Sequence, residues 1–174
     1  MRKRHVRSWA WEGTLDESEF WEIVEASARG GAGAGGDVSN RCGMIAAQLA
    51  ERTPDQVTGF ADVLAESLFR LDLRVLADTP VKGAVSRSGR PVPLSEDGFL
   101  YARCAVILAG RRAYGEVLAN PSGADFSPYT SDEAAVAEEL LEAAPTAFRR
   151  VTGAEWEHVE PFDCETGSNE DGWS

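Results

Sequence analysis

The chain has 174 residues, 43% of them hydrophobic, and a formal net charge of −12 at pH 7. A chain of this length buries roughly two-thirds of the surface that it exposes when unfolded, so folding requires neither disulfides nor a metal. No apolar run approaches the ~20 residues of a membrane-spanning helix, and three widely separated cysteines are typical of a reducing compartment, so we expect a cytoplasmic protein that does not span the membrane.

Charge divides the chain into three parts. Residues 1–14 carry four basic residues and one acid, and residues 154–174 carry seven acids and no Lys or Arg, which leaves −8 on residues 15–153. We interpret these parts as a basic N-terminal arm, a globular domain and an acidic C-terminal tail, with the arm pairing loosely with the tail. Polar residues interrupt the arm where a signal peptide needs an apolar segment. The negative domain repels phosphate backbones, so nucleic-acid binding by it is not expected.

Apolar residues of the domain recur at helical spacing, and no segment shows the alternation and bracketing turns of paired strands. A first helix is predicted from Asp16, its N-cap, to Arg29, with one broad apolar face: Phe20, Trp21, Val24 and Ala28. A second, weaker helix is predicted from about Val38 to Arg52, with inward residues Met44, Ile45, Leu49 and Cys42.

The third predicted helix has the clearest pattern in the sequence. Thr53 is expected as its N-cap and Pro54 as its first residue. Apolar residues follow at spacings of three and four over about five turns, which places them in one stripe: Val57, Phe60, Leu64, Leu68, Leu71 and Val75. Such a stripe requires partner helices on either side.

Residues 78–94 contain three prolines, which predicts a loop. Loops of this length are usually either functional or disordered. Ser95 is expected to cap a fourth helix that is apolar on all sides, which predicts the central helix of the core. A short fifth helix is expected from Arg111 to Leu118, and a sixth begins at Ser131, with Pro145 bending or restarting it. The tail is then either disordered or held by its aromatic residues.

The segment 95–121, SEDGFLYARCAVILAGRRAYGEVLANP, resembles the motif of a bacterial family of uncharacterised proteins, the DUF4240 domain. The shared features are an acidic capping turn, an aromatic pair with an Arg, a Gly-Arg step and an Asn-Pro stop. Supporting matches are EFWEIVEAS at 19–27, the apolar helix at 57–76 and EELLEAAPTAFRRVTG at 138–153.

This resemblance covers about residues 15–153, and the sequence departs from the family pattern beside the motif. The aromatic expected at 73–76 is missing, and the loop to Ser95 is longer. The resemblance implies an all-helical domain that occurs alone or attached to a WGR-type module in some bacterial regulators. It implies no catalytic residue.

The apparent phosphate-binding and metal-binding motifs are better explained as a linker and an acidic tail. The run GAGAGG at 31–36 matches the spacing of a dinucleotide fingerprint, but a helix precedes it where that motif needs a strand, which indicates a linker. Both histidines, His5 and His158, lie near the ends of the chain. The nearest set of metal-ligand types is His158 with Asp163 and Cys164, for which an acidic tail is the favoured interpretation.

Catalytic motifs are equally weak. Cys104 lies in an apolar helix with no histidine in the domain to activate it, which indicates a packing residue. The cluster Glu138, Glu139 and Glu142 lacks the Glu-x-x-His pairs of carboxylate bundles, which favours a solvated helix face.

Arg103 is the one charged residue between Phe99 and Ala109. A guanidinium keeps its proton, so a buried Arg103 needs a carboxylate or carbonyl partner. Two interpretations remain open. In one, Arg103 pairs with an acid of the third helix: Asp62, Glu66 or Asp72. In the other, it lines a cleft with Tyr101 and Arg111 and receives a carboxylate or phosphate from a ligand or partner protein.

The sequence therefore predicts an all-α single-domain bundle of about six helices that acts as a non-enzymatic interaction or regulatory module with an unknown protein partner. One alternative is an immunity- or antitoxin-like protein that neutralises a basic partner. Another is an enzyme or a binder of a small-molecule anion, which requires a pocket of roughly 300 Å³ at the Arg103 cluster. No catalytic residue, metal or cofactor is predicted, and the candidate binding residues are Trp21, Asp97, Phe99, Tyr101, Arg103 and Arg111.

Overall fold

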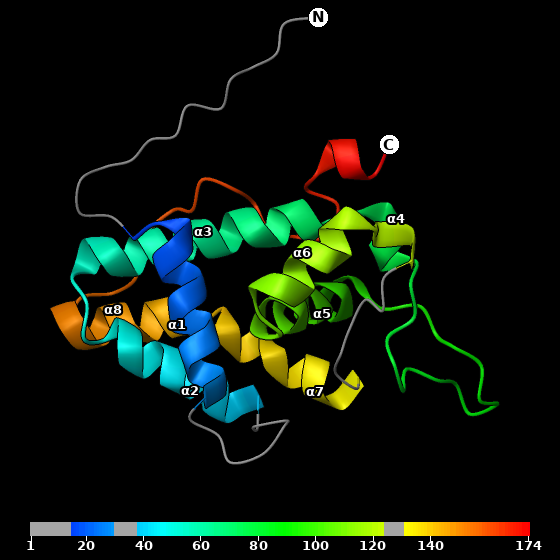
Figure 1. Ribbon diagram of the computed structural model, residues 1–174, viewed down its shortest axis with the longest axis horizontal. Helices are drawn as coiled ribbons and strands as arrows, with labels where there is room; N and C mark the ends of the chain where they lie inside the picture. The colour runs from blue at the N-terminus through cyan, green and yellow to red at the C-terminus, as the bar shows by residue number, and fades with distance from the viewer. Residues whose placement is uncertain (1–14, 30–37, 124–130) are drawn as a thin grey trace, which may run out of the picture.

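The computed structural model describes residues 15–29, 38–123 and 131–174, so the predictions for the basic arm and the glycine run lie outside the described residues. Within them, α5 (Glu96–Leu108) is the central helix that the apolar run predicts. Ser95 caps α5, because its hydroxyl accepts a hydrogen bond from the Gly98 amide at 3.1 Å. Every residue from 102 to 108 is buried, and other helices pack around α5 (Figure 1).

The first helix, α1 (Glu17–Arg29), begins at a reciprocal cap. The Asp16 carboxylate accepts from the Glu19 amide at 2.9 Å, and the Glu19 carboxylate accepts from the Asp16 amide at 3.1 Å. Its apolar face contacts α2, α3 and α5. Ala28, which was predicted to face inward, is exposed, because the buried stripe continues through Ser27.

The second helix, α2 (Val38–Leu49), carries a buried arginine that its apolar pattern conceals. Arg41 donates from Nε to the Ser27 hydroxyl at 3.3 Å and from its guanidinium to the carbonyl of Leu108, at the end of α5. It thereby joins three helices through polar contacts. Ile45 and Leu49 are buried as predicted, whereas Met44 is half-buried.

The third helix, α3 (Pro54–Leu71), begins as predicted but ends early. The predicted apolar stripe is buried as far as Leu71. Asp72 then leaves the helical conformation, with φ −76° and ψ 73°. Val75 belongs instead to the short α4 (Arg74–Ala77) and is 38% exposed. The backbone break at Asp72, which the spacing of apolar residues does not reveal, shortens the helix by one turn.

The loop 78–94 follows α4 and contains one two-residue β-bridge, between Val85 and Pro91. Gly110, with φ 98°, then turns the chain from α5 into α6 (Arg111–Ala119), followed by η1 (Pro121–Gly123). A left-handed φ of this size favours glycine.

The predicted sixth helix is divided into α7 (Ser131–Val136), η2 (Ala137–Leu140) and α8 (Ala143–Thr152). The division falls before Pro145, which lies in the first turn of α8, where its missing amide removes no helical hydrogen bond. Gly153 closes α8 with φ 71°. Beyond it the chain passes along α3 to η3 (Glu170–Gly172) (Figure 1).

The described residues form helices and connecting loops around one core, so the predicted all-α, single-domain architecture is confirmed. Side chains from α1, α2, α3, α5 and α8 meet in this core. In the part of the chain that the structure describes, no helix has the length and apolar character needed to cross a membrane.

Replacing the cap of α3 tests how much local signals stabilise the fold. The Thr53 hydroxyl accepts from the Gln56 amide at 3.3 Å, and the Gln56 side chain accepts from the Thr53 amide at 3.2 Å. We expect Thr53→Ala to lower the free energy of unfolding by about 1 kcal/mol. The measurement is urea denaturation followed by circular dichroism.

The matched control is Thr58→Ala, one turn into the same helix. Because alanine has the higher helix propensity, this variant should keep the wild-type stability or gain up to about 0.5 kcal/mol. Equal losses in both variants would contradict the capping role of Thr53.

Candidate functional site

Arg103 is completely buried at the centre of α5 and has partners within the chain. Its guanidinium donates to the carbonyl of Leu68 at 3.0 Å and to the carbonyl of Cys164 at 2.9 Å. It also donates to the Thr166 hydroxyl at 3.2 Å, and its Cζ lies 4.7 Å from the centre of the Phe99 ring. Burial lowers the pKa of Arg103, and the nearby Asp72 opposes this effect.

Asp72, also completely buried, is the carboxylate that faces this guanidinium at 4.0 Å. It was one of the three acids considered as partners of Arg103. The other two are engaged elsewhere: Asp62 with His158 at 2.6 Å, and Glu66 with Arg70. At 4.0 Å the attraction is mainly coulombic, so the Asp72 oxygens remain available as hydrogen-bond acceptors.

Those oxygens bind the end of the chain. They accept from the Gly167 amide at 3.0 Å, from the Asn169 amide at 3.0 Å and from the Trp173 indole Nε1 at 2.9 Å. Gly172 passes so close that a Cβ there would lie 2.6 Å from the Asp72 carbonyl oxygen. Arg103 and Asp72 together therefore fix residues 164–173 against α3 and α5.

We name residues 154–174 the C-terminal strap. From residue 155 to 166 its side chains alternate between half-buried and exposed, as in an extended strand. Three aromatic contacts hold it to the domain: Trp156 on Phe148, Phe162 on Phe69 and Trp173 on Phe99. Of the two interpretations of the tail, the structure agrees with the segment held by its aromatic residues.

A sequence signal for the strap exists in the acidic tail. In EWEHVEPFDCET, residues 155–166, mainly acidic and apolar positions alternate with a second set: Trp156, His158, Glu160, Phe162, Cys164 and Thr166. This is the period of a strand. No second strand or turn accompanies it in the sequence, and the strap packs on helices instead.

The Tyr101 side chain lies away from Arg103, because two residues on a helix are separated by about 200° around the axis. Its hydroxyl is hydrogen-bonded to Glu138 of η2, which raises the pKa of Tyr101 to about 12. Arg111 is exposed and lies 3.8 Å from Glu17 of α1. These three side chains therefore do not converge on a common anion.

The remaining candidate binding residues are also dispersed. Asp97 is exposed in the first turn of α5. Trp21 is buried, packs on Tyr114 with ring centres 5.1 Å apart, and donates from its indole to Glu17 at 3.4 Å. Phe99 alone among them adjoins Arg103. Of the six candidates, Phe99 contacts Arg103, and Trp21 and Arg111 each interact with Glu17.

The thiols are packed against the core, and Glu138 and Glu139 are held in side-chain hydrogen bonds. Burial raises the pKa of the Cys104 thiol far above its usual range and also raises that of Cys164. His158 faces Asp62, away from the Asp163 and Cys164 set. The glutamates of η2 point to different partners, Tyr101 for Glu138 and Ser39 for Glu139. Among the described residues, no group of His, Cys, Asp and Glu is arranged to hold a metal ion.

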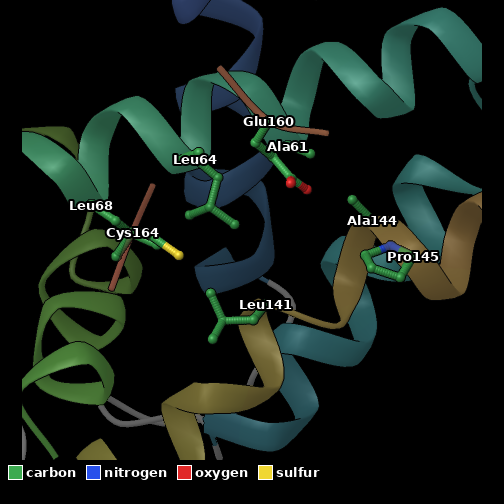
Figure 2. A pocket seen from close by; sticks show the side chains of 9 residues that line it. Ala61, Leu64, Leu68, Leu141, Ala144, Pro145, Glu160 and Cys164 are labelled. Carbon is green, nitrogen blue, oxygen red and sulfur yellow. The ribbon is translucent and has the colours of Figure 1, made fainter. Parts of the chain in front are cut away.

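A cleft of about 170 Å³ lies beside Arg103, between α3, α8 and the strap (Figure 2).

The family model described as a protein of unknown function (DUF4240) matches residues 15–150, which include all of α1 to η2 and most of α8. The chain belongs to the DUF4240 family. The match ends before the strap, so in this DUF4240 domain the partners of Arg103 and Asp72 include residues beyond the family model. Comparison with curated proteins and comparison with solved structures found no match.

Removing the charge of Asp72 tests whether the buried pair holds the strap of this DUF4240 domain. Asp72→Asn leaves the Arg103 charge without its carboxylate, so we expect the free energy of unfolding to fall by about 3 kcal/mol. We also expect Cys164 to react faster with iodoacetamide, because the strap opens more often. Cys42 and Cys104, both buried, report global unfolding in the same assay.

The control is Asp78→Asn, which removes an exposed carboxylate 3.4 Å from Arg74. An exposed pair contributes little, so this variant should stay within about 0.5 kcal/mol of the wild type. An unchanged rate of Cys164 labelling in Asp72→Asn would show that the pair does not hold the strap.

The Tyr101 contact predicts a pH effect. Because its folded pKa, about 12, exceeds the ordinary value of 10.0, Tyr101 stabilises the fold fully below pH 10, and this contribution is lost as pH rises through 12. Glu138→Ala should move the Tyr101 titration, followed by tyrosinate absorbance and assigned with Tyr101→Phe, back toward 10.0. Glu139→Ala, on the neighbouring residue, should leave it in place.

Proposed function

We propose that this DUF4240 domain is a non-enzymatic interaction module of the bacterial cytoplasm, and that a basic protein binds it along the outward face of the C-terminal strap. The observation that carries this proposal is the fixed, extended strap with its outward residues exposed: Glu155, Glu157, Val159, Pro161, Asp163 and Glu165. Four of these six carry a carboxylate.

The strap presents these acids at regular spacing. In an extended chain, alternate residues lie about 6–7 Å apart on one side, so the carboxylates form a row. Val159, in the middle of the row, is 85% exposed and offers an apolar contact. Because aromatic contacts and the buried Asp72 already order the strap, a partner that binds this face loses little free energy in ordering it.

Charge supports a basic partner. The chain carries −12 overall, and seven of its acids belong to the strap. Such a surface speeds the approach of a positively charged protein and disfavours anionic ones. Neutralisation of a basic toxin is one form that this interaction can take. Identification of the partner would show whether it is a toxin. The three cysteines form no disulfide with one another, which is consistent with the proposed reducing compartment.

The anion-binding alternative has less support. Arg103 directs its donors to Leu68, Cys164 and Thr166, and Arg111 lies next to Glu17. The cleft of about 170 Å³ is lined by a carboxylate, Glu160, and by no basic residue. An anionic substrate or ligand would meet repulsion there.

The test compares two triple variants that remove equal charge from different faces. The first, E155Q/E157Q/E165Q, removes three of the four outward carboxylates of the strap, and the second, E22Q/E25Q/E51Q, removes three exposed acids of α1 and the turn after α2. The tagged full chain recovers its partner from the native cell lysate, and the affinity of that purified partner is then measured by calorimetry. We expect a loss of at least tenfold for the strap variant and less than threefold for the control.

Three results would overturn this function. The first is equal binding of the partner by both variants, and the second is recovery of no protein at all by the wild-type chain. The third is a partner that is acidic at neutral pH, which would contradict the charge argument. Circular dichroism of both variants confirms beforehand that they fold.

A further inference from the structure

The cleft beside Arg103 has apolar walls. Ala61, Leu64 and Leu68 of α3 form one wall, and Leu141 and Ala144 form the other (Figure 2). Its volume is about 170 Å³, similar to the ~150 Å³ apolar cavity that stays dry and binds benzene. The walls offer water few hydrogen-bond partners, so a small apolar group is the better occupant.

The strap supplies the cleft with its two functional groups. Figure 2 shows the Glu160 carboxylate and the Cys164 sulfur both directed into the cleft. The Cys164 thiol stays protonated near neutral pH, since burial raises its pKa, and so adds to the apolar lining. Glu160 is therefore the charged group of this cleft.

Glu160 has no partner inside the chain. Its side chain is half-buried, and its carboxylate makes no hydrogen bond or ion pair within residues 15–29, 38–123 and 131–174. By contrast, Asp62 and Glu66 of the adjacent α3, and Asp72 just beyond its end, each face a histidine or arginine. The unpartnered Glu160 carboxylate at this apolar cleft therefore complements a ligand that joins a positive charge to an apolar body.

We propose that this cleft binds a small primary ammonium ion with an apolar body of about six carbons, its charge on Glu160 and its body between α3 and α8. The net charge of −12 favours the approach of such a cation and disfavours the matching carboxylate. This site is separate from the outward face of the strap and stands without the proposed protein partner.

Occupation of the cleft stabilises the strap. Two of the nine lining residues belong to the strap and the others belong to the helical domain, so the ligand bridges them. A ligand that binds the closed arrangement alone lowers the population of the open one. Cys164, inside the cleft, reports this as slower alkylation.

The test uses three six-carbon probes that differ in their head group: hexylammonium, 1-hexanol and hexanoate. Binding is followed by NMR chemical-shift titration of the full chain and by the rate of Cys164 alkylation. We expect hexylammonium to bind at least tenfold more tightly than hexanol, hexanoate not to bind, and hexylammonium to slow alkylation. Equal affinity for hexylammonium and hexanol, or no binding of any probe, would overturn the proposal.

Two substitutions assign the charge. Glu160→Gln should weaken hexylammonium about tenfold and leave hexanol unchanged, whereas Glu157→Gln, on the outward face of the same strap, should change neither. Ala61→Met, which fills the cleft, should abolish both. An unaltered affinity of Glu160→Gln for hexylammonium would show that Glu160 does not bind the cation, and this result stands even where Ala61→Met fails to fold.

Discussion

The fold depends on placing one permanent positive charge inside an apolar helix. Arg103 cannot lose its proton, and an unpartnered guanidinium in the core would cost several kcal/mol. Its partners come from two distant parts of the chain, the C-terminal end of α3 and the strap. Asp72 lies at the C-cap of α3, one turn beyond Leu68, and so faces the same guanidinium. The strap consequently packs against the core.

Both proposed binding surfaces follow from this arrangement. The buried pair holds residues 164–173 and aromatic contacts hold Trp156 and Phe162, which leaves the alternate residues of the strap outward with their row of acids. Between the held points the strap passes over α3 and α8 without filling the space beneath it, and the cleft is what remains. A surface for a protein and a cleft for a small cation thus lie on opposite sides of one segment, so changes in the order of that segment act on both.

Local features of the fold were predictable from the sequence, and features that need distant contacts were not. The caps at Asp16, Thr53 and Ser95 each involve residues three apart, so the sequence displays both partners together. Asp72, at the end of α3, accepts a hydrogen bond from the Gly167 amide 95 residues away. Apolar spacing, which continues through Val75, carries no sign of it. The division of the last predicted helix likewise precedes Pro145, the residue that suggested a break.

The candidate site was predictable in part. The apolar context of Arg103 indicated burial and limited its acidic partners to three, but the choice among them needed the path of the strap. The separation of Tyr101 from Arg103 follows from helical geometry alone and was available in the sequence. The cleft was not predictable from the sequence, because Glu160 and Cys164 line it from a segment whose acidic composition suggests solvent exposure.

The position of the strap in the chain has a consequence for synthesis. During translation the helices through α8 leave the ribosome before residues 164–173 do, and they can collapse around α5 while Arg103 still lacks the carbonyl of Cys164 and the hydroxyl of Thr166. The nascent domain then holds a charge that water must reach, so its core stays permeable. Sealing of the core is therefore a late event, timed by the emergence of the segment that ends at Trp173.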